Sequence, residues 1–201
     1  MEPFSSLLDW ATGEITPCSH VVTRRISDME GMYLDREATQ RLILEGNPVV
    51  YRVFNVPVPE EYGHLQHCTS IVFPGKVGDE YFMTKGHFHV RRNTGEIYLG
   101  LQGEGLILLQ DETDMVKALP IKPGVIVYIP PGWAHRAVNT GKVPLVFFAV
   151  YLGEAGHDYG VIEKKGFAQL VMERNGVPVL VPNPNYGKTE PCKKDKGQSR
   201  R

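Results

Sequence analysis

The chain has 201 residues, enough for one domain of ordinary size with a buried core. Its formal net charge is −1, its isoelectric point is near 6.7 and no basic face is present, so nucleic acids and anionic membranes are poor candidate partners. No apolar run approaches the ~18 residues of a membrane span, and the start does not resemble a signal peptide. Three widely spaced cysteines argue against a disulfide framework. We therefore expect a cytoplasmic protein that acts on a small molecule.

The clearest helix signal lies early in the chain. Asp35 can cap a run over residues 36–45 that contains neither glycine nor proline, and Gly46 and Pro48 follow that run. We therefore predict a short helix within an N-terminal extension, residues 1–48, that packs on the main domain.

From residue 49 onward, short apolar runs alternate with turn residues, and the chain holds 21 glycines and 15 prolines. This pattern predicts strands and turns. Nine strands in about a hundred residues favour a barrel over residues 49–186, because closure removes the sheet edges and leaves room inside for one small ligand. A basic, flexible tail is expected at 187–201. The predicted strands are 49–56, 69–73, 82–90, 96–101, 106–110, 116–119, 125–129, 136–139 and 145–151, with flanking strands at 161–162, 170–173 and 177–181.

Three histidines and one glutamate have the spacing of a metal site. His87 and His89 are two residues apart on a predicted strand, so both should point inward. A turn then brings Glu96 back toward them, and His135 follows a Pro-Pro-Gly segment. Any one of these histidines alone is more often an ordinary core residue, but three imidazoles and one carboxylate together supply four donors for a divalent first-row metal.

Strand alternation assigns the neighbours of these residues. It places Phe88 and Val90 on the outward face of the 82–90 strand. In the next strand it places Tyr98 on the same face as Glu96, so Tyr98 should line the cavity that holds the histidines.

The two segments resemble the two cupin motifs. Residues 124–139 carry the complete second motif, Gly124-x5-Pro130-x-Gly132-x2-His135-x3-Asn139. The first motif is matched by His-x-His, a later glutamate and Gly103, but six residues separate His89 from Glu96 and no glycine stands five residues before His87. The resemblance implies an all-β fold, a single cupin (double-stranded β-helix or jelly-roll) barrel with an N-terminal extension containing a short helix.

Two further segments resemble a particular branch of cupins. Thr84-Lys85-Gly86-His87-Phe88-His89 and Ala155-Gly156-His157-Asp158-Tyr159-Gly160 closely resemble the cupin-type glucose-6-phosphate isomerases of archaea, and the similarity spans about residues 24 to 186. It implies interconversion of glucose 6-phosphate and fructose 6-phosphate in glycolysis and gluconeogenesis, and a homodimer. It also implies one divalent metal per subunit, Fe2+ in the first place, with Mn2+, Ni2+, Co2+ or Zn2+ as the alternatives.

The resemblance also implies roles for single residues. Glu96 would be a metal ligand that doubles as the base of a cis-enediol mechanism, or a ligand only if hydrogen moves as a hydride. The other catalytic candidates are His157 and Tyr151. The candidates for substrate and phosphate binding are Tyr51, Ser70, Thr84, Lys85, Gly86, Tyr98 and Tyr159.

One of these assignments conflicts with regular strand geometry. Strict alternation places Thr84 and Gly86 on the face opposite His87, whereas Lys85 shares the face of His87. A bulge near Gly86 would turn Thr84 and Gly86 into the pocket. With a regular strand, Lys85 would be the phosphate ligand instead.

Two other functions use the same kind of site. A non-haem iron dioxygenase also binds its metal through histidines and a carboxylate, but the hydroxyls of Tyr51, Ser70 and Thr84 favour a polar, phosphorylated substrate. A non-catalytic sugar-binding cupin is disfavoured because the full set of metal ligands is present. The sequence leaves the native metal and any use of mannose 6-phosphate open.

Overall fold

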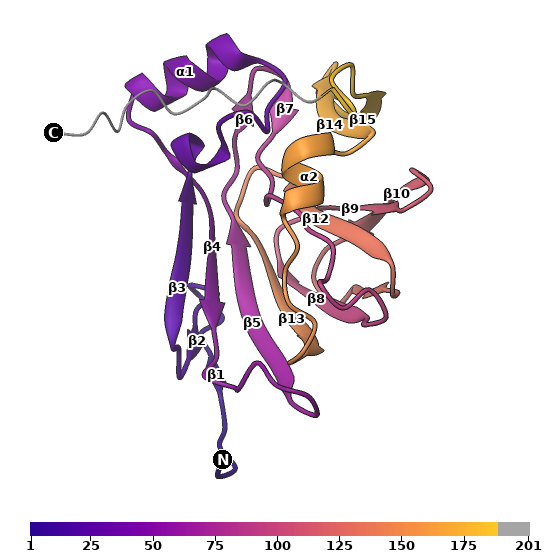
Figure 1. Cartoon of the computed structure of the whole chain (residues 1–201). Helices are drawn as coiled ribbons and strands as arrows, with labels where there is room; N and C mark the ends of the chain where they lie inside the picture. The colour runs from indigo at the N-terminus through magenta and orange to yellow at the C-terminus, as the bar shows by residue number, and fades with distance from the viewer. Residues whose placement is uncertain (189–201) are drawn as a thin grey trace, which may run out of the picture.

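The computed structural model describes residues 1–188 and is built mainly from antiparallel strands, which confirms the predicted cupin barrel (Figure 1). The largest sheet has the strand order β11-β8-β13-β5-β4-β3, and a three-stranded sheet has the order β10-β9-β12. Their bounds are β3 His20–Arg25, β4 Val49–Asn55, β5 Leu65–Val72, β8 Glu96–Gln102, β9 Gly105–Asp111, β10 Val116–Ile121, β11 Ile126–Ile129, β12 Trp133–Asn139 and β13 Leu145–Leu152.

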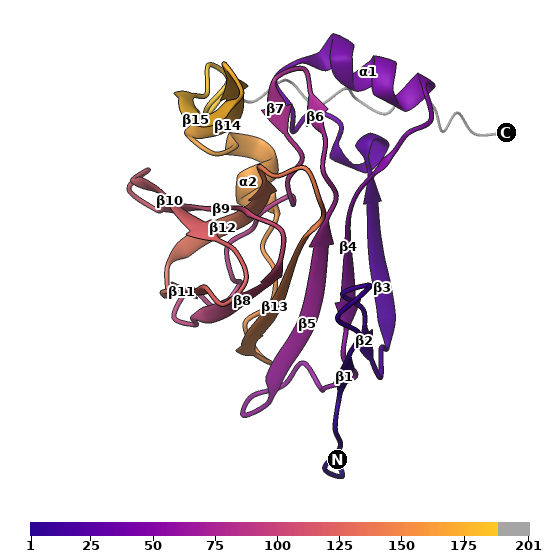
Figure 2. The same ribbon diagram turned by 180° about the vertical axis from the view of Figure 1, so that it is seen from behind.

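Alternation of side chains explains how these strands enclose an interior. Along β8, Glu96 and Tyr98 are buried while Ile97, between them, is exposed. Residues from both sheets, including Phe147 of β13 and Ile107 of β9, join one hydrophobic core. Figure 2 shows the two sheets from behind, with β5 and β13 on one side of this core and β9 and β12 on the other.

Smaller elements cover the ends of the barrel. Strands β6 (Lys76–Val77), β7 (Glu80–Tyr81), β14 (Gln169–Arg174) and β15 (Val177–Pro182) form a four-stranded sheet at the end that also carries α1, whereas β1 (Leu7–Leu8) and β2 (Ile15–Thr16) pair near the N-terminus (Figure 1). The predicted flanking strands at 170–173 and 177–181 are therefore confirmed.

The predicted early helix is confirmed as α1, Arg36–Leu44. The Asp35 side chain accepts a hydrogen bond from the backbone N–H of Ala38 at 2.8 Å, which is the expected N-cap contact. A short 3-10 helix, Ile26–Met29, precedes it. None of the helices within residues 1–188 is long and apolar enough to cross a membrane.

The prediction of a strand at 161–162 is wrong, because these residues lie in the helix α2, Gly160–Lys165. Two apolar residues in a row are too few for periodicity to separate a strand from a helix. Ile162 packs into the core, and Gly166, at φ +76°, ends the helix by donating its N–H to the Ile162 carbonyl at 2.8 Å.

The prediction of a strand over residues 82–90 is also wrong. Only isolated bridges occur there, pairing Met83 with Val138, His87 with His135 and Phe88 with Asp158. Val90 is 64% exposed, as predicted, but Phe88 is only 4% exposed and belongs to the core rather than to an outward face. Gly86, at φ +76°, lies outside the strand conformation and interrupts the run, and Phe88 is covered by the Asp158 segment that it pairs with and by Arg92, which lies over its ring at 4.5 Å from the centroid.

The N-terminal segment contributes a strand to the main sheet, because β3 pairs with β4 along its whole length. The division at residues 48 and 186 stays a prediction. Most of the predicted tail, residues 189–201, lies outside the described residues.

Candidate active site

The four predicted metal ligands come together inside the barrel. His87 and His135 are joined by two backbone hydrogen bonds, from His87 N to His135 O at 3.2 Å and from His135 N to His87 O at 3.0 Å. Glu96 opens β8 and His135 lies on β12. With His89, these residues each present one ligand atom, and the four atoms lie within 4.8 Å of one another. One ion can therefore contact all four.

Backbone carbonyl groups fix the ring orientations of two of the histidines. The Nδ1 atom of His89 lies 3.1 Å from the carbonyl oxygen of Thr94, and Nδ1 of His135 lies 3.2 Å from that of Trp133. Each carbonyl selects the tautomer with the proton on Nδ1, which leaves the Nε2 lone pair directed at the centre of the cluster. The Nε2 atoms lie 3.1 Å (His89) and 2.9 Å (His135) from Oε2 of Glu96.

A buried nitrogen without a partner marks the centre of this cluster. Nε2 of His87 is inaccessible to solvent and forms no hydrogen bond. Such atoms are rare in folded proteins and require an explanation. A metal ion bound by the four side chains would satisfy this nitrogen, and imidazole and carboxylate donors suit first-row divalent metals. The residues therefore fit the predicted metal.

Burial and neighbouring charges set the protonation of the site. Burial, with the adjacent imidazoles, holds the pKa of His87 well below its usual value, so this ring is neutral at pH 7 and its lone pair is available. Burial acts against ionisation of Glu96, but His135 and His89 outweigh it and lower its pKa to about 2. A neutral imidazole and an ionised carboxylate are the forms that bind a metal.

Next to this cluster lies a pocket of about 190 Å3. Its walls include all the residues that the resemblance implied for substrate contact and for catalysis, together with three of the four predicted metal ligands. His89 lies behind this wall in the same cluster. We call the four predicted ligands, His87, His89, Glu96 and His135, the histidine end, and we call Tyr51, Ser70 and Thr84 the hydroxyl end.

The conflict between Thr84 and Lys85 is resolved by the irregular backbone, since Thr84, Lys85 and Gly86 all line the pocket. Thr84 Oγ1 accepts a hydrogen bond from the N–H of Ala137 at 3.0 Å. A side chain on Gly86 would not fit, because its Cβ would lie 2.8 Å from Phe167 and 3.1 Å from the His135 carbonyl oxygen. Lys85 Nζ lies 3.3 Å from Glu163 Oε1 of α2.

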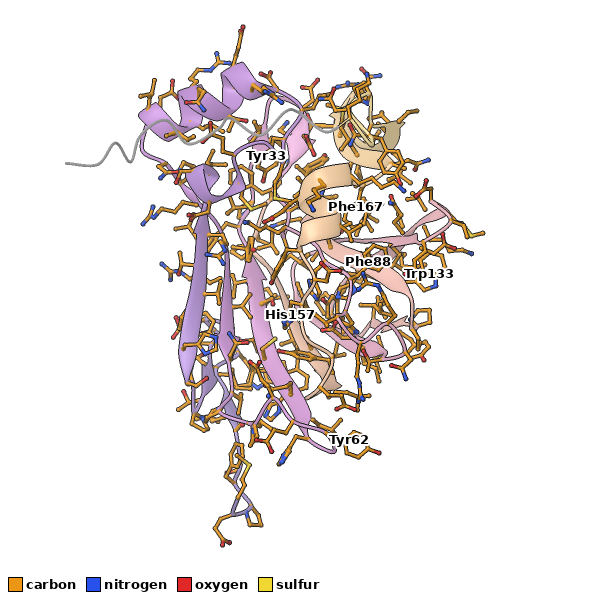
Figure 3. All side chains as sticks on the ribbon, in the orientation of Figure 1. Tyr33, Tyr62, Phe88, Trp133, His157 and Phe167 are labelled. Carbon is orange, nitrogen blue, oxygen red and sulfur yellow. The ribbon has the colours of Figure 1, made fainter. Side chains whose placement is uncertain are left out.

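A third group of aromatic side chains borders the pocket. The ring of His157 lies 4.5 Å from that of His87 and 5.5 Å from that of Tyr151, and it stacks on Tyr159 at 6.0 Å between centroids. Figure 3 shows His157 near the middle of the barrel. Burial lowers the pKa of His157 below its usual value, so this ring is also neutral at pH 7.

The loop that carries His157 is tied to the histidine end. Phe88 and Asp158 exchange backbone hydrogen bonds of 3.2 and 2.8 Å. Arg92 donates to Asp158 Oδ2 at 2.7 Å and also to the backbone carbonyl of His89. One guanidinium therefore links the segment of a predicted ligand to the loop of His157.

Sequence reasoning missed several residues that line the pocket. Asn55 and Cys68 share strand parity with Tyr51 and Ser70, so parity would have identified both once the inward face was known. His20 also lines the pocket, and only its pairing opposite Asn55 reveals it. Glu60, from the β4–β5 loop, carries no local signal.

Comparison with known proteins assigns the family. The glucose-6-phosphate isomerase (GPI) family model matches residues 23–187. The glucose-6-phosphate isomerase of Thermococcus litoralis is 46% identical over 92% of this chain and 97% of its own length, and that of Pyrococcus furiosus is 46% identical over 93% and 98%. The chain belongs to the glucose-6-phosphate isomerase family.

The predicted resemblance to glucose-6-phosphate isomerases is thus confirmed. A putative glucose-6-phosphate isomerase 2 of Rhizobium meliloti is 36% identical over 87% of this chain and 88% of its own. A solved cupin 2 barrel protein of Salinispora arenicola matches more weakly, with 21% identity, a TM-score of 0.37 and coverage of 51% and 75%, and the assignment to the isomerase family does not depend on it.

Proposed function

We propose that this chain interconverts glucose 6-phosphate and fructose 6-phosphate with one divalent metal held by His87, His89, Glu96 and His135. The observation that carries the proposal is the meeting of four ligand atoms within 4.8 Å beside a pocket in a member of this family. We propose Fe2+ as the native metal. Manganese, nickel, cobalt and zinc accept the same donors, so supply in the cell contributes to the choice.

The reaction moves a carbonyl group between C1 and C2 of the open-chain sugar, which requires hydrogen transfer between adjacent carbons. A bound divalent ion supplies Lewis-acid polarisation of substrate oxygens and stabilises the negative charge that develops on them. We propose that Glu96 carries the proton between the two carbons, because it is ionised, buried and at the histidine end of the pocket. In a direct hydride shift Glu96 would only hold the metal.

The route of the hydrogen can be read from solvent exchange. If Glu96 carries a proton, its carboxyl group can exchange that proton with solvent, so the product formed over many turnovers in D2O should contain deuterium at the carbon that receives it. A product free of deuterium after many turnovers would favour the hydride shift.

The open-chain sugar forms when the anomeric hydroxyl loses a proton and the ring oxygen gains one as its bond to the anomeric carbon breaks. We propose that His157 accepts the hydroxyl proton and returns it to the ring oxygen, since the lowered pKa of His157 keeps its imidazole neutral near pH 7. Tyr151 lies beside it and is 9% exposed, and burial keeps its phenol protonated, so it can donate a hydrogen bond to a sugar oxygen.

We propose that the phosphate group occupies the hydroxyl end. The hydroxyls of Tyr51, Ser70 and Thr84 can donate to phosphate oxygens, Gly86 allows its backbone to approach closely, and Lys85 adds positive charge. Tyr98 and Tyr159 would contact the sugar. This arrangement orients C1 and C2 toward Glu96.

We also propose a cytoplasmic homodimer. The support for a second copy is an apolar outer face of the six-stranded sheet, where Ile97 is 45% exposed and its direct partner in the register, Tyr128, is 60% exposed. The paired strands β8 and β11 place these side chains together. Sedimentation should give twice the chain mass.

A metal-replacement assay tests the proposed activity. Chelated protein receives each divalent metal in turn, and turnover is measured with fructose 6-phosphate and with unphosphorylated fructose. We expect activity to return with metal and on the phosphate ester only. Full activity in protein shown by elemental analysis to be free of metal would overturn the proposal.

A further inference from the structure

A second cavity, of about 660 Å3, lies between the chain that follows the 3-10 helix and the helix α2. It shares no lining residue with the 190 Å3 active pocket. Figure 3 shows two of its lining residues, Tyr33 and Phe167, on the α1 side of His157. Its volume is within the range of cavities that hold small metabolites.

One wall of this cavity contains a buried charge with few partners. Arg136 is 3% exposed and offers five N–H donors. Nη2 donates to the Lys85 carbonyl oxygen at 2.5 Å, Nη1 contacts the sulfur of Met83 at 3.0 Å, and Nε has no partner. Within residues 1–188 Arg136 forms no ion pair with a carboxylate, although the charge of the nearby Glu80 acts on it. A buried guanidinium normally pairs with an anion.

The rest of the lining combines positive charge with an apolar surface. Lys164 of α2 is exposed at the rim, and the side-chain amide of Asn183 contributes polar atoms. The lining also includes Phe167 and Leu170, which are 1% and 4% exposed, and Arg136 lies over the Phe167 ring at 4.4 Å from its centroid. The cavity therefore offers cations for an acidic group, and the cation–π contact with Phe167 holds the Arg136 guanidinium in place.

We propose that this cavity is a second ligand site that binds the phosphate group of a small molecule, with the phosphate paired to Arg136 and Lys164. The site is separate from the isomerase pocket and from the hydroxyl end. Phosphate suits it because a guanidinium can present two parallel N–H donors to two oxygens.

Two contacts connect the second site to the active pocket. Arg136 donates to the backbone of Lys85, and Glu163, which lines the second cavity, pairs with the Lys85 side chain. Since Lys85 also lines the active pocket, occupancy of one site changes affinity at the other, and by linkage the effect is reciprocal. This linkage rests on the proposed function, whereas the binding site does not.

Calorimetry on the metal-loaded full chain tests the binding site, with adenosine 5′-monophosphate as the probe and adenosine as the matched ligand without phosphate. We expect one monophosphate per chain and at least tenfold weaker binding of adenosine. No saturable binding, or equal binding of adenosine, would each overturn the site.

Charge reversal of single lysines tests whether the monophosphate binds at this cavity. Lys164→Glu should weaken binding of the monophosphate about tenfold, the effect of losing one charge-assisted contact. Lys142→Glu, in the exposed β12–β13 loop, makes the same change of charge elsewhere and should leave it unaltered. Equal affinities of the two variants would contradict the proposal.

The KM for fructose 6-phosphate tests the linkage. The monophosphate should change this KM in the wild type and should not change it in Lys164→Glu. An unchanged KM in the wild type would overturn the linkage.

Discussion

The two ends of the active pocket are built in different ways. At the histidine end, three of the four side chains lie within ten residues of sequence, are largely buried, and two rings are fixed by backbone carbonyls. At the hydroxyl end, Tyr51, Ser70 and Thr84 come from three separate segments, and a glycine at φ +76° lies beside them. The histidine end is thus preorganised by local structure, whereas the hydroxyl end depends on how distant strands are aligned.

Loss of a histidine should have the largest effect. In His135→Ala the cluster loses one of four donors, so metal affinity and turnover should both fall, by roughly a hundredfold or more. Metal content by elemental analysis and kcat with fructose 6-phosphate measure the change. His64→Ala, outside the active pocket, is the matched control and should keep both values. Turnover retained by His135→Ala would remove this residue from the site.

The same contrast explains what could be predicted from sequence. The spacing of His87, His89 and Glu96 and the Pro-x-Gly-x-x-His segment are short-range signals, so the cluster could be predicted without knowing the fold. The signals for the helix that follows Asp35 and for most strands are equally short-range. The sequence could not decide whether Thr84 or Lys85 faces the pocket. The answer depends on one backbone dihedral angle at Gly86, which tertiary contacts with Phe167 and His135 impose.

Gly86→Ala tests that dependence. The alanine would adopt a positive φ, and its Cβ would contact Phe167 at 2.8 Å, so we expect about 2–4 kcal/mol of destabilisation and a raised KM. Gly124→Ala has a similar φ of +82° but no atom within 4 Å, so it should cost only about 1 kcal/mol. Chemical unfolding gives both values. Equal costs would mean that packing around Gly86 is unimportant.

Glu80 tests the electrostatics of a buried carboxyl group that the charge of Arg136 acts on. Burial raises its pKa to about 7, so the folded state holds a proton that the unfolded state releases near pH 4.5. The stability from this group is complete below pH 4.5 and is lost as the pH rises through 7. Glu80→Gln does not titrate, so between pH 5 and pH 8 it should gain on the order of 2 kcal/mol relative to wild type. Parallel curves of unfolding free energy against pH would contradict this.

Ser70→Ala should have the smallest effect and should separate the two ends. It removes one neutral hydroxyl from the hydroxyl end, so KM for fructose 6-phosphate should rise about fivefold while metal content stays constant. Ser5→Ala, near the exposed N-terminus, is the control. A fall in bound metal would show that the ends are not independent.

Anomalous diffraction from metal-loaded crystals tests the central claim most directly. We expect one strong peak per chain, within coordination distance of Nε2 of His87, His89 and His135 and a carboxylate oxygen of Glu96. A peak bound by other residues, or none in crystals of protein that is fully active, would contradict the account.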